Sequence, residues 1–134
     1  MIVVTDAPQV IAHIERVLKI RIARPCNAFG YMTGDGEPIA GVVVNDYTGS
    51  NCELTVVAEK GRITRSVLRH LASHVFHKLG CRRATIRTRK SNKALLRMIP
   101  RFGFSFECVA KHFYPDDDAV VFRMLKRNCQ WIER

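Results

Sequence analysis

The sequence lacks the segments that would place a protein in a membrane or send it out of the cell. No stretch approaches the roughly 20 consecutive apolar residues of a membrane-spanning helix. The first residues are apolar, but Asp6 and Pro8 interrupt them at once and no basic residues precede them, which is unlike a signal peptide. We therefore expect a cytoplasmic protein that makes no contact with a membrane.

Metal and disulfide motifs are also missing. The five cysteines are odd in number and widely spaced, and none forms a CxxC pair, so reduced and mostly buried thiols are expected. His70, His74 and His77 lie on one helical strip with ligand-like spacing, but no acid or cysteine joins them and the nearby charge is positive. The pattern predicts a solvated basic helix face and no metal site.

Acidic residues are absent from one long segment. Residues 62–101 contain twelve lysines and arginines and no aspartate or glutamate, whereas the whole chain has a net charge of +10. We call this segment the basic block. Its one-sided field attracts anions, which include the phosphates of a cofactor, a nucleic acid or an acidic protein. Charge alone does not choose among these partners.

The remaining composition is that of an ordinary globular domain. The chain has 134 residues, of which 47% are hydrophobic and 25% are charged. This is enough to close a core around one sheet. No internal repeat or linker-like stretch divides the chain. The sequence therefore predicts a single domain over residues 1–134.

The first half of the chain predicts a short opening strand, one helix and three further strands. Asp6 with Pro8 marks a helix start, and the apolar residues after it keep a helical period to about residue 19. Residues 28–47 carry a glycine-containing turn between apolar runs, which predicts a hairpin. Glu53–Ala58 follows as a third strand of the same meander.

The hydrophobic period then changes to that of a long helix. Apolar residues recur about every 3.6 positions from Ile63 to Leu79, and Gly80 ends the pattern. The rest of the chain predicts a strand at 83–88, a short helix capped by Ser91 that buries Ala94, Leu95, Met98 and Ile99, and strands at 104–113 and 119–125.

This order of elements predicts an α/β (α+β) fold. A mixed, mostly antiparallel sheet with flanking helices is its natural outcome. The strand, helix and strand at about 53–88 form a crossover. Such crossovers are right-handed, so the two strands should lie side by side and parallel.

The segment from Leu79 to Lys111 carries a resemblance to a known family. Its LGCRRATIRT strand, its SNKALLRM helix opened by Asn92, and its RFGFSFECVAK run resemble the GNAT superfamily of N-acetyltransferases. The order of elements agrees over nearly the whole chain. The Gly61-x-x-Thr64-Arg65 opening of the long helix and the late DDDAVVFRMLKRNCQWI are similar to small GNAT-like proteins of phages and prophages, which implies a host cytoplasm.

The resemblance implies acetyl-CoA as the cofactor, held where a strand runs into the long helix. Free amides and the dipole at a helix start bind a pyrophosphate without a metal. Two glycines usual in this turn are replaced by Arg62 and Thr64. Arginine and hydroxyl groups could hold the phosphates instead, and the alternative is a site that no longer binds the cofactor. The implied contacts are Val57, Ala58, Arg62, Ile63, Thr64, Arg65, Ser66 and Asn92, with Lys60 or Arg89 at the ribose phosphate.

The family chemistry implies direct attack of an amine on the thioester, with a base that removes the proton of the amine. Glu53 is the candidate base, and the alternative is an exposed glutamate paired with a nearby arginine. The family's tyrosine falls on Ile99, so Tyr114, or else Tyr47, is the candidate to replace it. Asn92 is expected either to contact the cofactor or a water, or to cap the short helix.

Two functions therefore stand side by side. The first is an N-acyltransferase that moves an acetyl group from acetyl-CoA to an amine. The second is a catalytically degenerate GNAT-like module of a phage, which binds a host protein or nucleic acid through the basic block. The acceptor amine is not identified, although a cleft lined by Glu53, Asp46 and Asp35 would admit a cation. An edge strand, or apolar residues near Trp131, could turn a monomer into a homodimer.

Overall fold

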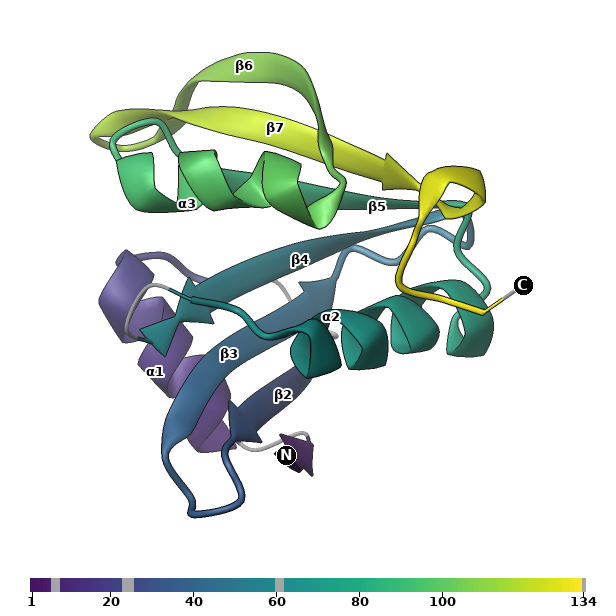
Figure 1. Cartoon of the computed structure of the whole chain (residues 1–134). Helices are drawn as coiled ribbons and strands as arrows, with labels where there is room; N and C mark the ends of the chain where they lie inside the picture. The colour runs from purple at the N-terminus through teal and green to yellow at the C-terminus, as the bar shows by residue number, and fades with distance from the viewer. Residues whose placement is uncertain (6–7, 23–25, 60–61, 134) are drawn as a thin grey trace.

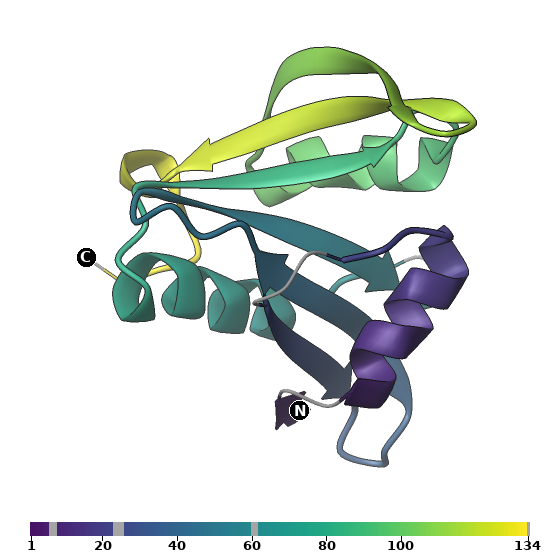
Figure 2. The ribbon, with the colours of Figure 1, turned by 180° about the vertical axis from the view of Figure 1, so that it is seen from behind.

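The computed structural model describes residues 1–5, 8–22, 26–59 and 62–133. They form a seven-stranded sheet with α1 (Pro8–Leu18) on one face and with α2 (Arg65–Ala72) and α3 (Lys93–Met98) on the other (Figure 1). Figure 2 shows the face that α1 covers. The predicted α/β class, a mostly antiparallel sheet with flanking helices, is therefore confirmed.

The strands are β1 (Ile2–Thr5), β2 (Cys26–Met32), β3 (Pro38–Asn45), β4 (Asn51–Ala58), β5 (Arg83–Arg89), β6 (Ser105–Tyr114) and β7 (Asp117–Leu125). Their order in the sheet is β1-β2-β3-β4-β5-β7-β6, and β4 with β5 is its parallel pair. The predicted hairpin is the β2–β3 pair. The predicted crossover joins β4 to β5, and both predictions are confirmed.

The long helix consists of α2 and a continuation. It passes without a break into a π-helical segment, Ser73–Lys78, and the chain then turns at Gly80, whose φ is +71°. Glycine adopts this left-handed conformation without strain, so the predicted end of the helix is confirmed. Short 3-10 turns follow α3 at Ile99–Phe102 and β7 at Lys126–Asn128.

The short helix α3 differs from its prediction in two ways. Asn92, not Ser91, caps it, because the Oδ1 of Asn92 accepts a hydrogen bond from the Leu95 amide at 3.2 Å. The Ser91 amide instead donates to Asp117 at the start of β7, at 3.0 Å, which holds Ser91 in the turn before the helix. Ala94 is exposed. A six-residue helix turns one narrow face to the core, and Leu95 fills it.

Two apolar cores lie on the two faces of the sheet. The larger is under α2 and α3, and Val67, Val75 and Phe76 of the long helix are almost fully buried in it. The smaller surrounds Ile14 of α1. Each helix is therefore held by the apolar stripe that the sequence pattern predicts.

Two glycines allow α1 to lie close to the sheet. A side chain at Gly41 would meet Ile14 at 3.3 Å, and one at Gly30 would meet Val10 at 3.1 Å. Both distances are shorter than an ordinary contact between carbon atoms. The close packing fixes α1 on β2 and β3, and so it also fixes the segment that follows the helix.

The parallel strands β4 and β5 pair over only part of their length. Their register ends at the pair of Leu54 with Ile86. Beyond this pair, β4 remains paired with β3, and β5 remains paired with β7. The sheet therefore has an N-terminal half (β1–β4) and a C-terminal half (β5–β7), and the two halves separate at this end (Figure 1). Thr55–Ala58 and Arg87–Arg89 diverge at this place, which we call the fork.

Candidate active site

The start of α2 offers backbone donors to an anion. Thr64 is the N-cap, since its Oγ1 accepts from the Val67 amide at 3.3 Å and its carbonyl accepts from the Leu68 amide at 3.1 Å. The amides of Arg65 and Ser66 belong to the first helical turn, whose N–H groups point out of the helix. The helix dipole adds positive potential there. A phosphate group could therefore bind without a metal.

The predicted cofactor contacts have different surroundings. Arg62 and Arg65 are exposed beside the helix start. Val57 packs on the smaller core and Ile63 on the larger one, so both side chains serve the packing of the fold. Lys60, the candidate for the ribose phosphate, lies outside the described residues, as does the glycine after it.

The end of β4 is tied to α1. Ala58 closes the strand in register with Ala40 of β3. The next residue, Glu59, accepts a hydrogen bond at Oε1 from the Nε2 of His13, at 3.0 Å. The chain that leads from β4 toward α2 therefore departs from a fixed point.

The basic block divides between the two faces of the sheet. Three of its arginines lie on β5 and pair with acids outside the block: Arg83 with Glu107, Arg87 with Glu53, and Arg89 with Asp116. The rest of the block lies on α2, on α3 and in the segments beside them, which share one face (Figure 1). The surplus positive charge is therefore on the same face as the start of α2.

A cleft of about 650 Å³ opens at the fork on the opposite face, the side of α1. Its walls come from the end of α1 and the segment after it, the end of β3, the strands β4 and β5, and the turn between β6 and β7. We call it the polar cleft, and it is lined by residues 15, 19–22, 45, 46, 53, 55, 87 and 113–115.

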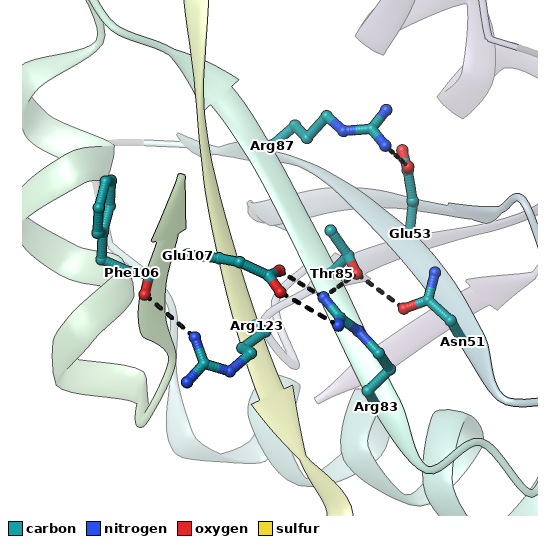
Figure 3. A network of polar contacts seen from close by, with 8 residues as sticks. All are labelled: Asn51, Glu53, Arg83, Thr85, Arg87, Phe106, Glu107 and Arg123. Atoms are coloured by element: carbon teal, nitrogen blue, oxygen red, sulfur yellow. Dashed lines mark hydrogen bonds and ion pairs between the residues drawn. The ribbon is translucent and has the colours of Figure 1, made fainter. Parts of the chain in front are cut away.

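Glu53 lines the polar cleft with only 13% of its side chain exposed. Its carboxylate forms an ion pair with Arg87 on β5 (Figure 3). Burial raises the pKa of Glu53, Arg87 lowers it without cancelling the shift, and the carboxyl group of Asp46 raises it further. A cleft carboxyl group with a raised pKa suits general base chemistry near neutral pH. The glutamate is paired with an arginine, but it is not on the exposed surface.

Two residues at the end of β3 join Glu53. Asp46 has a φ of 51°, a left-handed conformation that is uncommon for residues other than glycine and gathers at functional sites. Asn45 is 8% exposed, and its Oδ1 has no hydrogen-bond partner in the described part of the chain. Sequence reasoning missed Asn45 and Arg87. Their signals were a polar residue that ends the apolar run 39–44 and the alternating arginines of β5.

Three residues considered for the site lie elsewhere. Asp35 was predicted to line the cleft with Glu53, but it is in the turn before β3, and Asp46 is at the other end of that eight-residue strand, roughly 25 Å away. Tyr47 is 55% exposed, and its hydroxyl donates to the Leu79 carbonyl at 3.0 Å, outside the cleft. Ile99 is fully buried in the larger core.

Tyr114 connects the polar cleft to the fork. It lines the cleft and also a narrow pocket of about 20 Å³ that Val56 and Asn92 share. Burial raises the pKa of Tyr114, and the nearby arginines only reduce the shift, so the phenol stays protonated at neutral pH. A protonated hydroxyl group at this place can donate a proton. Of the three predicted catalytic residues, the fold therefore brings Glu53 and Tyr114 to one cleft and Asn92 to the adjoining pocket.

Arg89 closes the fork on the side of α1. Its Nη2 donates to the Leu18 carbonyl at 3.1 Å, its Nη1 pairs with Asp116, and its guanidinium group lies 4.4 Å from the centre of the Tyr114 ring. These contacts keep the pocket at the fork small. Arg89 was considered for the ribose phosphate, but these contacts hold its side chain on the face opposite the start of α2.

His77 is exposed, as the prediction of a solvated helix face requires, but His70 and His74 are not part of such a face. His70 lies with its Nδ1 2.7 Å from the Tyr31 hydroxyl, and His74 is buried with its ring 4.8 Å from that of Phe29. His70 and His74 therefore lie against the aromatic residues of β2. The described residues contain no group of three or more His, Cys, Asp or Glu that could hold a metal ion.

Comparison with solved structures identifies the fold. A spermidine N-acetyltransferase variant from Vibrio cholerae is similar with a TM-score of 0.75, over 100% of this chain and 99% of its own, at 9% identity. A GNAT-family acetyltransferase from Bacillus anthracis is similar with a TM-score of 0.64, over 75% of this chain and 66% of its own, at 14% identity. The chain therefore has the GNAT acetyltransferase fold, as the resemblance in its sequence predicted.

Comparison by sequence adds nothing to this result, because no protein-family model and no curated protein matches the chain. A shared fold at such low identity does not fix an activity or a substrate, which must be argued from the site. Within the described residues, no helix is both long enough and apolar enough to cross a membrane.

Proposed function

We propose that this protein is an acyl-CoA-dependent N-acyltransferase, which moves an acetyl group from acetyl-CoA to an amine by direct attack. The proposal rests on the arrangement of residues at the fork. A helix start that can bind an anion lies on one face of it, and a cleft with a largely buried carboxyl group lies on the other. A cofactor and an acceptor can therefore reach the same point from opposite faces.

The residues around the fork fit the parts of acetyl-CoA. The amides of Arg65 and Ser66 and the guanidinium group of Arg62 suit a pyrophosphate. The β5-facing edge of Thr55–Ala58 has no strand partner in the described part of the sheet, so its backbone groups can pair with the amides of an extended arm. When bound, the cofactor supplies an activated thioester.

The fork must open for this binding. Its pocket holds only about 20 Å³, and Arg89 spans it to the Leu18 carbonyl. In this proposal, Arg89 releases Leu18 as the cofactor enters, and the two halves of the sheet separate slightly. The movement needs no change in the strand pairing within either half.

The polar cleft then supplies the proton transfers. Glu53 takes a proton from the ammonium group of the acceptor, directly or through a water, and its raised pKa suits this task. Arg87 fixes the position of the carboxylate. Tyr114 keeps its proton and can give it to the departing thiolate. Asn92 holds the start of α3 at the fork, since its Oδ1 caps that helix.

One observation favours a second function, a catalytically degenerate binding module. The surplus charge of the basic block gathers on the face of α2 and α3, and Arg62 and Thr64 stand in place of two glycines of the family turn. Such a face could bind a nucleic acid or an acidic protein of a host. Binding to nucleic acid would weaken steeply with salt, because each neutralised phosphate releases counterions.

Thermal unfolding with and without acetyl-CoA tests the proposed function. A ligand that binds only the folded protein stabilises it by about 2.7 kcal/mol at a hundred times its Kd, so the midpoint should rise. Arg65→Glu should weaken the binding about tenfold or more, because it sets a negative charge against the phosphates. The matched control Arg82→Glu makes the same charge change at the other end of the crossover and should leave the shift intact.

Two results would count against the proposed acyltransferase function. If millimolar acetyl-CoA does not shift the midpoint of the unaltered protein, the acyltransferase proposal is wrong. If, in addition, a DNA or RNA oligonucleotide binds in dilute buffer and is lost as salt rises, the second function is supported.

A further inference from the structure

Six charged side chains line the polar cleft: Glu15, Lys19, Arg21, Asp46, Glu53 and Arg87. Some are already engaged within the protein. Glu15 accepts a hydrogen bond at Oε2 from the Ile22 amide at 2.9 Å, which fixes the segment after α1. Glu53 and Arg87 form the ion pair between the two halves of the sheet (Figure 3). The hydrogen bond leaves the negative charge of Glu15 in place, so Glu15 offsets part of the positive charge near it. The other three charged residues are Lys19, Arg21 and Asp46.

These three residues come from two parts of the lining and carry opposite charges. Asp46 follows β3 and lies beside the Glu53 carboxyl group, so one wall carries acidic oxygen atoms. Lys19 and Arg21 are exposed, belong to the segment after α1, and form no ion pair among the described residues. Two cations outnumber the one carboxylate of Glu15, so among the described residues this second wall carries a net positive charge. The gradient between the walls favours a ligand that carries both charges.

The remaining lining is apolar or aromatic. Phe113 is 47% exposed and has the Arg87 guanidinium group 4.8 Å from its ring centre, which makes it a flat wall between the charged groups. Ile20 and Pro115 extend this surface. A short hydrocarbon group of a ligand could lie against it.

We infer that the polar cleft binds an amine that also carries an acidic group, of the kind found in amino acids or phosphorylated amines. Its ammonium group lies on the side of Asp46 and Glu53, and its acidic group meets Lys19 and Arg21. The inference rests on the proposed function, because it names the acceptor class for the same site. It disfavours polyamines, since a second ammonium group would meet the basic wall.

Calorimetric titration of the full chain with four amines tests this inference without relying on turnover. Leucine and isoamylamine are a matched pair that differ only in the carboxylate. O-phosphoethanolamine presents a phosphate instead, and spermidine presents only ammonium groups. The better of the two acid-bearing amines should bind about fivefold or more tightly than isoamylamine or spermidine, and it identifies which acid the basic wall prefers.

A charge-reversal variant tests the basic wall itself. The double change Lys19→Glu and Arg21→Glu should abolish the preference for the acid-bearing amine and raise the affinity for spermidine. The control Arg16→Glu changes the charge of an exposed residue of α1 outside the cleft and should leave the preference as it was. These residues are not the base or its partner, so the proposed proton transfer remains in place.

Several results would overturn the inference. They are tighter binding of spermidine, equal binding of leucine, O-phosphoethanolamine and isoamylamine, no binding of any amine, or a preference that survives the double reversal. Failure of the proposed function is a separate result. It would appear as a missing thermal shift with acetyl-CoA, while the four titrations would still report on the cleft.

Discussion

The two halves of the sheet are stabilised in different ways. Helices cover both faces of the N-terminal half, and an apolar core lies under each, of which the larger continues under α3 into the C-terminal half. In the C-terminal half, α3 covers one face, whereas the other presents arginines of β5 that pair with acids, such as Arg83 with Glu107 at 2.6 Å (Figure 3). Apolar packing gives the first half a fixed frame. The polar face of the second half stays open where a substrate can reach it.

Polar contacts join the halves along their boundary on the side of α1. The partners on β5 are alternate residues, which point to the same face of a strand. Thr85 donates to Asn51 at 2.7 Å, Arg87 pairs with Glu53, and Arg89 donates to the Leu18 carbonyl. On this face the polar groups can be exchanged for the groups of a ligand, whereas the apolar core that crosses the boundary on the other face cannot. The difference explains why the candidate site lies between the halves.

Glu53→Gln should have the largest effect, and this effect should be on activity. The glutamine keeps the size of the side chain and an oxygen for Arg87, but it cannot act as the base. We expect kcat/KM for an acceptor amine to fall by about 10²–10⁴ while the free energy of unfolding changes little. Release of the coenzyme A thiol, followed with a thiol reagent, measures the first quantity, and urea unfolding measures the second.

Arg87→Gln is the matched control for that change. It breaks the same ion pair and leaves the carboxyl group of Glu53 in place, so more activity should remain than in Glu53→Gln. If the two variants lose activity equally, the pair matters as a link between the halves, and Glu53 is not the base.

Ile14→Ala should produce the next largest effect, this time on stability. The side chain is fully buried under α1, so its removal leaves a cavity and should cost about 2–5 kcal/mol. Glu107→Gln removes a partly exposed ion pair of the C-terminal half and should cost below about 1 kcal/mol. Urea unfolding of both variants measures the contrast, and similar losses would contradict the comparison of the two halves.

The smallest expected effect concerns pH and His70 of α2, which contacts Tyr31 of the N-terminal half. Burial lowers the pKa of His70, and Lys78 lowers it further, so the unfolded chain takes up the proton at a higher pH than the folded protein does. This contribution to stability is full above the ordinary histidine pKa of about 6.5 and is lost as the pH falls through the lower folded pKa.

Urea unfolding at a series of pH values between about 7.5 and 5 measures this dependence. The free energy of unfolding should decrease toward acid, and His70→Gln should flatten the decrease. His77→Gln, a change at an exposed residue of the same helix, is the control and should leave the slope intact. An unchanged slope in His70→Gln would show that other groups cause the dependence.

Local patterns predicted the elements of the fold well. The apolar period from Ile63 to Leu79 and the glycine after it located the long helix, because burial of one helical face and a left-handed turn are decided by neighbouring residues. The exception was at α3, where Ser91 and Asn92 can both cap a helix. A contact from Ser91 to Asp117, distant in the sequence, decided between them.

The candidate site was predictable only in part. Glu53 and Tyr114 were selected because the resemblance to GNAT enzymes implies a base and a tyrosine, and the fold places both in one cleft. The partner of Glu53 was not predictable, because the parallel register of β4 with β5 determines it. The expectation for Asp35 failed for a similar reason, since the length of β3 separates it from the cleft.

The sequence by itself determined which segments become helices and strands, which side chains can move a proton, and where an uncompensated positive charge lies. Only the tertiary structure decided which of these meet. Arg83, Arg87 and Arg89 belong to a block without acids, yet each finds an acid from another segment, because strand register and the alternation of side chains bring distant residues within reach. The same geometry leaves the surplus charge on the face of α2 and places the carboxyl groups on the face of α1.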